Sequence, residues 1–452
     1  MLSDRRLGWS RSLVGAAALL IGAWGVGCTS APAASPTAAP AKPTEAAKPA
    51  AASSPAAAGS PAAAPSPAAK PAEPAPASKV ASGPAIKIGV LHSTTGPFLF
   101  EGVGGNEGLK LYWDSENNQV NGRPVQFIYE DTEGNPNNAL TKVRKLVEQD
   151  QVNLIIGPIG SNEALAIRDY VHGNKVPMVL GYSIAKDLTQ DKGSPYVFRV
   201  GGSLQIGAGG GWYAAAKLNY RRALVVSADY AAGRDAAAMF KQYFEGAGGK
   251  VLNEIYVPLG ATDVAPYITQ LRSEIANADV VVLPQIVGGT ASQFVKAYDQ
   301  FGLKGQIPMY TSAVTLDEAS TLPPAGDSAL GLVNYGEWAL TLDTPENKRF
   351  VESFQAKYAK EPGQHHLFGY MEARVIGEAL KAAGSAVDDK DKVAEAMRKV
   401  TFDSPKGPFK FDDKQQAVIT MFIRKVENQG GTFRNVVIDT IPSVDQFWKA
   451  PS

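Results

Sequence analysis

The sequence predicts an α/β protein with two doubly wound parallel-sheet lobes, and three observations support this fold class. After residue 84, short β-rich runs alternate with amphipathic helical stretches, which is the pattern of β-α-β units with parallel strands. This alternation starts again near residue 223, so two such series follow each other along the chain. The run 153–157 is a continuous apolar strand, as expected where helices cover a strand on both faces.

The first series begins with the β-rich run IKIGVL and continues through a loop of Gly, Pro, Ser and Thr residues. An amphipathic pattern then predicts a helix from about Asn106 to Asn117. Later apolar runs bounded by turn residues predict further strands, and helical periodicity predicts further helices. The strands are expected at 86–91, 125–129, 153–157 and 177–180, and the helices at 106–117, 136–149 and 161–171.

The second series shows the same alternation of strands and helices, with short runs rich in valine separated by helical stretches. Its strands are expected at 223–227, 251–258, 280–283 and 309–310, and its helices at 233–246, 264–276 and 290–301. Two more helices are expected after it, at 345–360 and 366–383, followed by strands at 418–426 and 432–440.

The first 28 residues resemble an export signal. Three arginines (Arg5, Arg6 and Arg11) precede an apolar run, 13–24, that is shorter than the roughly 20 residues of a membrane span. The run leads to Val26-Gly27-Cys28, which resembles the lipobox of bacterial lipoproteins, where the cysteine receives a lipid. Gly25 stands where that motif usually has Leu, so plain secretion remains open beside lipidation at Cys28.

Composition sets the limits on the rest of the chain. Residues 29–84 are mostly Ala, Pro, Ser and Lys and cannot bury enough apolar surface to fold, so we expect a disordered tether. Lys plus Arg and Asp plus Glu are both 44, which gives no net field that would favour nucleic acid. Because Cys28 is the one cysteine, disulfide bonds are excluded.

Four separated segments carry a family resemblance: IKIGVLHSTTGPFLFEG, LIIGPIGSNEALAIRDYV, ADYAAGRD and DVVVLPQIVGGTASQFVKAYDQFGLKGQ. Together, and in this order, they resemble the Leu/Ile/Val-binding family of periplasmic substrate-binding proteins. The resemblance covers nearly everything after the tether. It implies a type I binding-protein fold, in which two lobes are joined by three hinge strands and close on a ligand between them.

The resemblance also implies where the chain passes between the lobes. The crossings are expected near Gly201, Asn334 and Asp412. Each lobe is then built from separate segments: the first lobe from 85–201 and 335–412, and the second lobe from 202–334 and 413–452.

In open parallel sheets, ligands lie beyond the carboxyl ends of the strands. Gly160 and Ser161 stand at such a junction, where a helix N-terminus and a hydroxyl can bind an anion. The alternative is that Ser161 only caps its helix. The resemblance implies a carboxylate-binding serine at Ser161 and a ligand-binding carbonyl at Ser183, beside Tyr182. It also implies a threonine where Ala185 stands, and alanine has no hydroxyl.

The second lobe departs from the family pattern as well. The amino-acid-binding members have an acidic residue where Ser312-Ala313-Val314 stands here. A buried ammonium without a counter-charge costs several kcal/mol, so an amino acid ligand needs another carboxylate, and Glu101 is available. Phe98 and Phe100 are expected either to line the pocket or to pack beneath the loop. Tyr230, Gln285 and Ser312 complete the predicted contacts.

The remaining motifs give no catalytic prediction. The histidines His92, His172, His365 and His366 lack metal-ligand spacing, so each is expected to be structural or solvated. The glycine-rich run 207–212 lacks the full dinucleotide fingerprint and is interpreted as tight helix packing. There is no nucleophile elbow and no Walker loop. We therefore expect no enzyme, no metal and no cofactor.

The sequence thus favours an exported substrate-binding protein of the cell envelope, held to the membrane through its lipid anchor only. It is expected to capture an amino acid or a carboxylate by hinge closure and to deliver it, as a monomer, to the permease subunits of an ABC importer. A ligand-sensing lipoprotein, an enzyme and a structural surface protein remain the alternatives.

Overall fold

The computed structural model describes residues 83–451. The chain divides into two units, 1–74 and 75–452, and everything below concerns the second. The predicted export signal, Cys28 and nearly all of the predicted tether lie outside the described residues. Within residues 83–451, no helix combines the length and the apolar character needed to cross a membrane.

The first sheet has six strands in the order β2-β3-β1-β4-β5-β6. All neighbours are parallel except β2 and β3, and the chain winds outward in both directions from β1. Side chains alternate between its two faces, so that Ile88 packs with α1 and α10, and Ile155 packs with α2 and α3. The strands are Ile86–Val90, Gln119–Val120, Arg123–Tyr129, Leu154–Ile156, Met178–Leu180 and Val197–Arg199.

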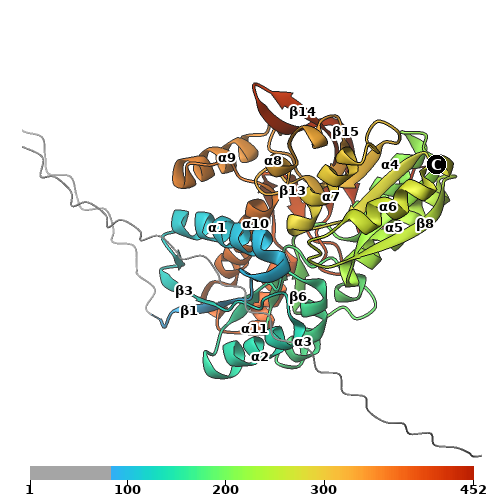
Figure 1. Cartoon of the computed structure of the whole chain (residues 1–452). Helices are drawn as coiled ribbons and strands as arrows, with labels where there is room; N and C mark the ends of the chain where they lie inside the picture. The colour runs from blue at the N-terminus through green and yellow to red at the C-terminus, as the bar shows by residue number, and fades with distance from the viewer. Residues whose placement is uncertain (1–82, 452) are drawn as a thin grey trace, which may run out of the picture. The chain divides into compact units, whose positions relative to one another are not determined.

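The second sheet has seven strands in the order β15-β14-β11-β10-β9-β7-β8. Strands β7 to β11 are parallel, and the long hairpin β14–β15 adds two antiparallel strands at one edge. The parallel strands are Arg222–Asp229, Lys250–Pro258, Val280–Gln285, Met309–Ser312 and Val333–Gly336, and the hairpin is Ile419–Gln429 and Thr432–Val444. The predicted fold class, with two doubly wound lobes, is therefore confirmed (Figure 1).

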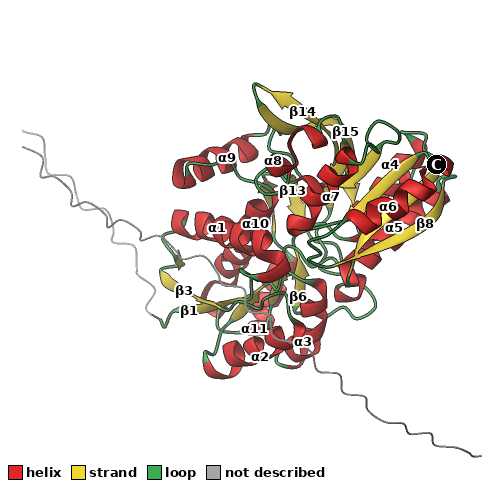
Figure 2. Ribbon diagram, in the orientation of Figure 1, coloured by secondary structure: helices red, strands yellow, loops and turns green. Residues whose placement is uncertain are grey.

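Helices cover both faces of each sheet (Figure 2). In the first lobe they are α1 (Leu99–Ser115), α2 (Pro136–Arg144), α3 (Ser161–Gly173), α10 (Gln364–Ala383) and α11 (Lys390–Arg398), with α9 (Pro345–Tyr358) against α1. In the second lobe they are α4 (Leu204–Ala216), α5 (Ala231–Gly246), α6 (Ala265–Glu274), α7 (Gly288–Gln300) and the short α8 (Leu322–Ala325). A small hairpin of β12 (Thr401–Ser404) and β13 (Gly407–Lys410) precedes β14.

The chain passes from one sheet to the other after β6, after β11 and after β13. Buried polar groups tie these crossings together. Glu337 accepts hydrogen bonds from the backbone N–H of Gly202 and from Lys406, and Gln416 donates to the carbonyl of Gly201 at 2.8 Å. The crossing expected near Asn334 lies close to the end of β11, which stays in the second sheet as far as Gly336 because it pairs with β10 and β14.

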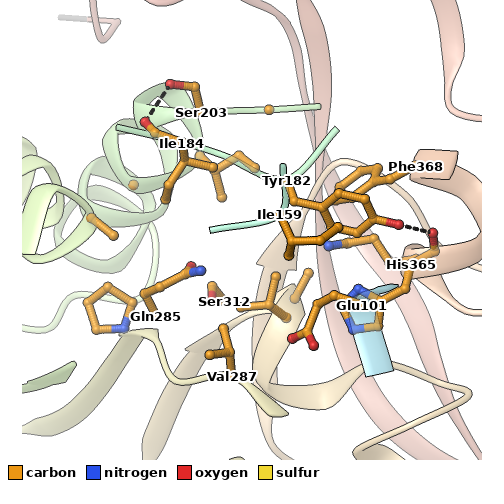
Figure 3. A pocket seen from close by; sticks show the side chains of 18 of the residues that line it. Glu101, Ile159, Tyr182, Ile184, Ser203, Gln285, Val287, Ser312, His365 and Phe368 are labelled. Carbon is orange, nitrogen blue, oxygen red and sulfur yellow. Dashed lines mark hydrogen bonds between the residues drawn. The ribbon is translucent and has the colours of Figure 1, made fainter. Parts of the chain in front are cut away.

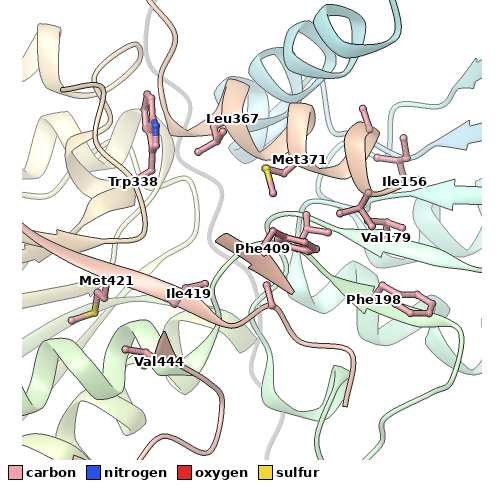
Figure 4. Close-up of a cluster of buried hydrophobic side chains, with 14 of the residues drawn as sticks. Ile156, Val179, Phe198, Trp338, Leu367, Met371, Phe409, Ile419, Met421 and Val444 are labelled. Atoms are coloured by element: carbon pink, nitrogen blue, oxygen red, sulfur yellow. The ribbon is translucent and has the colours of Figure 1, made fainter. Parts of the chain in front are cut away.

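The same buried core extends from the first sheet to the second through these crossings. Figure 4 shows Ile156 and Phe198 from the first sheet, Phe409 from the small hairpin, and Ile419 and Met421 from the second sheet. All of these side chains are almost completely excluded from solvent. The two lobes therefore share packing at the hinge rather than meeting only through linkers.

The first helix differs most from its predicted bounds, because α1 begins at Leu99 rather than near Asn106. Its glycines lower helix propensity and led to the expectation of a loop. They are needed for packing: a Cβ at Gly102 would lie 1.8 Å from the carbonyl oxygen of Ser93, and one at Gly108 would lie 1.8 Å from that of His366. Phe100 and Glu101 therefore belong to the first helical turn.

Candidate functional site

A pocket lies between the two lobes, beyond the carboxyl ends of the parallel strands, and contains about 700 Å³ of space, part of it open to solvent. Loops after β1, β4, β5 and β6 and the first turns of α10 form the first-lobe wall, and loops after β7, β9 and β10 form the second-lobe wall. The lining residues are Phe98, Glu101, Ile159, Tyr182, Ile184, Gly202, Ser203, Ile206, Gly207, Tyr230, Ala236, Pro284, Gln285, Val287, Ser312, Ala313, Val314, Gln364, His365 and Phe368.

Aromatic rings from both lobes form much of the wall. Phe98 of the first lobe packs against Tyr230 of the second, with ring centroids 5.9 Å apart. Tyr182 meets Phe368 edge to face at 5.3 Å. Phe98 also joins Ile159 and Val287 in an apolar cluster that spans the lobes. These walls suit an apolar or aromatic ligand body.

Glu101 places a carboxyl group in this mostly apolar pocket and is only 4 % exposed. Burial raises its pKa, while the charge of His365 and hydrogen bonding from the backbone act in the opposite direction. The Oε2 atom of Glu101 has no hydrogen-bond partner in the described part of the chain.

The polar atoms beside Glu101 are also unsatisfied. Figure 3 shows Glu101 and His365 close together on one side of the pocket. Among residues 83–451, His365 Nδ1, Gln364 Oε1 and Ser312 Oγ are buried without a hydrogen-bond partner. Buried polar groups normally find partners, so these atoms are available to a bound solute.

Asp317 makes a second polar contact between the lobes. It follows β10 in the second lobe and accepts a hydrogen bond of 2.5 Å from the backbone N–H of Gln364, at the N-terminus of α10 in the first lobe. Although burial acts to raise it, the charges of His365 and His366 hold the pKa of Asp317 below its usual value. An ionised carboxylate is favourable at this end of a helix dipole.

Among the residues predicted for the site, Glu101, Tyr182, Tyr230, Gln285 and Ser312 line the pocket. Gln285 Nε2 donates to the Tyr230 hydroxyl at 3.1 Å, and burial raises the pKa of Tyr230. For Phe98, the sequence left open whether it lines the pocket or packs beneath the loop. Its side chain lines the pocket and also packs against Ile159 and Val287. The structure brings these side chains together from distant segments. Their contact with a ligand stays a prediction.

The other predicted residues do not line the pocket. Phe100 points away from it and is 39 % exposed, beside Leu99 and Val103 on the outer face of α1. The N–H of Gly160 donates to the carboxylate of Glu163 at 2.8 Å, so this amide is already used.

The two predicted serines are buried just behind the wall. Ser161 Oγ accepts hydrogen bonds from the N–H groups of Ile184 (2.9 Å) and Ala185 (3.2 Å). The Ser183 hydroxyl lies 3.0 Å from the Pro158 carbonyl oxygen and donates within the wall. Both side chains therefore fasten loops together, a role that the family comparison did not suggest for either.

Some lining residues were missed by sequence reasoning. His365 and Phe368 come from α10, far along the chain, and His365 was expected to be structural or solvated. Ile159, Ile184 and Val287 lie beside predicted positions, and no polar signal marks them. Within residues 83–451, no group of His, Cys, Asp and Glu residues has the arrangement of a metal site.

His92 lies behind the wall rather than in it. Its Nε2 is 3.3 Å from Glu372 Oε2 and its Nδ1 is 2.9 Å from Asn106 Oδ1, with the Tyr182 ring against it. The glycine-rich run 207–212 is part of α4, and a Cβ at Gly211 would lie 2.3 Å from the carbonyl oxygen of Phe240. Tight helix packing thus explains that run.

Comparison with known proteins agrees with this architecture. The family model described as "Periplasmic binding protein" matches residues 85–432. The Leu/Ile/Val-binding protein homolog 6 of Brucella abortus (strain 2308) is 28% identical over 370 residues, which are 80% of this chain and 93% of that protein.

Solved structures match along the same part of the chain. An ABC transporter substrate-binding protein from Sphaerobacter thermophilus is 40% identical, with a TM-score of 0.75, and the match covers 80% of this chain and 99% of that one. A solute-binding protein of an ABC transporter from Rhodopseudomonas palustris BisB5, in complex with 3,4-dihydroxybenzoic acid, is 29% identical, with a TM-score of 0.76 and the same coverage. This chain belongs to the periplasmic binding protein family.

Proposed function

We propose that this protein captures a single-ring aromatic carboxylate, with a hydroxyl group on the ring, and delivers it to an ABC importer. The observation that carries the proposal is the pocket itself: aromatic rings from both lobes surround a buried carboxyl group with an unsatisfied oxygen. The Rhodopseudomonas palustris relative in complex with 3,4-dihydroxybenzoic acid supports this ligand class. Family membership places the protein outside the cytoplasm.

The apolar walls supply most of the binding free energy in this proposal. Burial of roughly 150 Å² of ring surface is worth about 4 kcal/mol at 25 cal/mol per Å², before the costs of association. Edge-to-face contacts with rings such as Tyr182 and Phe368 add about 1 kcal/mol. The ring hydroxyl then donates to Glu101 Oε2, which has no donor among the described residues.

A hydrophobic amino acid is the second candidate, and Glu101 is again the specific observation in its favour. Among residues 83–451, Glu101 is the one carboxylate that lines the pocket. An ammonium group needs a buried counter-charge, and an ionised Glu101 would provide it. The Brucella abortus relative carries a Leu/Ile/Val-binding name, which supports this candidate.

Titration calorimetry with 4-hydroxybenzoate, benzoate and leucine separates the candidates. Burial raises the pKa of Glu101, so binding of an ammonium group should release a proton as this carboxyl ionises. The binding enthalpy of leucine would then depend on the ionisation enthalpy of the buffer, and that of 4-hydroxybenzoate would depend on it much less. The proposal fails if none of these solutes binds.

Closure of the two lobes is the expected mechanism of capture. The pairs Phe98–Tyr230 and Asp317–Gln364 join the lobes across the pocket. A solute that bridges these walls shifts the population toward the closed form, which the permease recognises. The predicted lipid anchor at Cys28, the tether 29–84 and the monomeric state belong to the same proposal, because a tethered monomer can shuttle between solute and permease.

A further inference from the structure

Arg199, at the end of β6, carries a buried positive charge close to the pocket. Its side chain is completely excluded from solvent. Its hydrogen bonds go to neutral oxygens: the carbonyls of Ser183 (3.2 Å) and Ala185 (2.8 Å), and the side chains of Thr189 and Gln416. Burial of an ion costs several kcal/mol, and a carboxylate partner usually offsets that cost.

The two carbonyls that Arg199 holds flank Ile184, a residue of the pocket wall. The peptide unit between Ser183 and Ile184 is held at both ends, because its N–H donates to Ser161 Oγ at 2.9 Å. The N–H of Ala185 donates to the same oxygen at 3.2 Å. Arg199 and Ser161 together therefore fix the peptide unit between Ser183 and Ile184, with its N–H, the positive end of its dipole, on the side away from the guanidinium.

The pocket needs such a charge if its solute is an anion. Within the part of the chain that the structure describes, no Lys or Arg side chain lines the pocket, and the carboxyl group of Glu101 opposes an anion when ionised. A charge in the low-dielectric interior acts over longer distances than a charge in water. Burial lowers the pKa of Arg199 to about 9, so the guanidinium stays charged at neutral pH.

We infer that Arg199 is a positioning residue that makes the pocket selective for solutes with a carboxylate, through the loop 183–185 and through its own charge. The inference rests on the proposed function and deepens it, since it names the charge of the solute. It applies equally to an aromatic carboxylate and to the carboxylate of an amino acid.

The test compares pairs of solutes that differ in one charge: 4-hydroxybenzoate with 4-hydroxybenzamide, and leucine with leucinamide. The dissociation constants are measured at pH 7 by calorimetry on the purified protein. In the wild type, we expect the carboxylate to bind at least about 30-fold more tightly than its amide. Arg199→Met and Arg199→Gln should weaken carboxylate binding about 10- to 30-fold and change amide binding less than about threefold. Arg199→Lys should retain most of the preference.

Arg424 provides a matched control. It is also completely buried, but it lies in β14 of the second lobe and donates to Asn334 and Trp338. Arg424→Met should lower the melting temperature and leave the carboxylate-to-amide ratio unchanged. If the Arg199 variants weaken both members of a pair equally, Arg199 is only structural and the inference is wrong.

A measurement on the wild type covers the case in which the Arg199 variants do not fold. The affinities of benzoate and benzamide are compared at pH 7, and a preference of at least about 30-fold for benzoate is expected. Equal affinities overturn the inference, whereas failure of every wild-type carboxylate to bind overturns the proposed function.

Discussion

The two sides of the pocket satisfy their polar groups in different ways. The side around Ile184 uses its hydrogen bonds internally, through Ser161, Ser183 and Arg199. The side around Glu101 and His365 leaves buried polar atoms without partners in the described residues. The first side is thus a preformed scaffold, and the second is where a solute supplies the missing partners. Except at Arg199, whose charge acts on the solute, mutations on the scaffold side should mainly cost stability, and those on the open side should mainly cost affinity.

Among variants that test the difference between the two sides, Glu101→Gln is expected to change ligand affinity most. The amide keeps an acceptor oxygen for a ring hydroxyl but removes the charge that an ammonium group needs. The affinity for leucine should therefore fall about 30-fold, or about 2 kcal/mol, and the affinity for 4-hydroxybenzoate should change less than about threefold. Stability should change little. Calorimetry and thermal unfolding of the same sample measure both quantities. Glu107→Gln is the control, because Glu107 lies on the outer side of the same helix and pairs with Lys360.

Ser183→Ala tests the scaffold side. Its hydroxyl lies 3.0 Å from the carbonyl oxygen of Pro158 and 3.1 Å from that of Ile159. Loss of this donor should lower the free energy of unfolding by about 1–2 kcal/mol and change the dissociation constant less than about threefold. Urea denaturation and calorimetry provide the two readouts. A strong loss of affinity at unchanged stability would contradict the distinction between the two sides.

Asp317→Asn tests the contact between the lobes. It removes a charge from the N-terminus of α10 and retains an acceptor, so the closed form should lose about 0.5–1 kcal/mol. Affinity should fall about two- to fivefold for every solute, whatever its charge. Small-angle scattering at saturating solute should still show full closure. A change confined to one solute class would instead make Asp317 part of the open side.

The smallest expected effect is a pH dependence of the protein's stability that is caused by Glu101. Because burial raises its folded-state pKa above 4.5, its neutral form is favoured in the folded protein. Its contribution to stability is complete below the unfolded pKa and is lost as the pH rises through the folded pKa. The melting temperature of the wild type relative to Glu101→Gln should therefore decline by a few degrees from pH 4.5 to pH 8. If the melting temperature of the wild type relative to Glu101→Gln instead rises with pH, the pKa of Glu101 is lowered in the folded protein rather than raised.

Sequence periodicity predicted most strands and helices because most are long, or apolar on a regular face. It missed β6 and β11, which have three and four residues and too few positions to show a period. It also began α1 too late, since its glycines are selected by contact with Ser93 and His366 rather than by helix propensity. Such close approaches exist only in the folded molecule.

The site was only partly predictable for a related reason. Strand ends and family motifs pointed to Glu101, Tyr182 and Tyr230, and all three line the pocket. The motifs could not show that Ser161 uses its hydroxyl oxygen to hold the amides of Ile184 and Ala185. The motifs also could not show that His365 lines the pocket. This residue belongs to α10, which reaches the pocket only because the later segment 335–412 returns to the first lobe.

The shared core at the hinge has a consequence for cooperativity. Buried side chains from Phe198 to Met421 form one continuous cluster through both sheets, so neither sheet can lose its packing while the other keeps it. The two lobes should therefore melt in one transition, despite their separate sheets and discontinuous segments. A solute that contacts only the pocket then raises the melting temperature of the whole domain. A single thermal unfolding curve therefore measures binding.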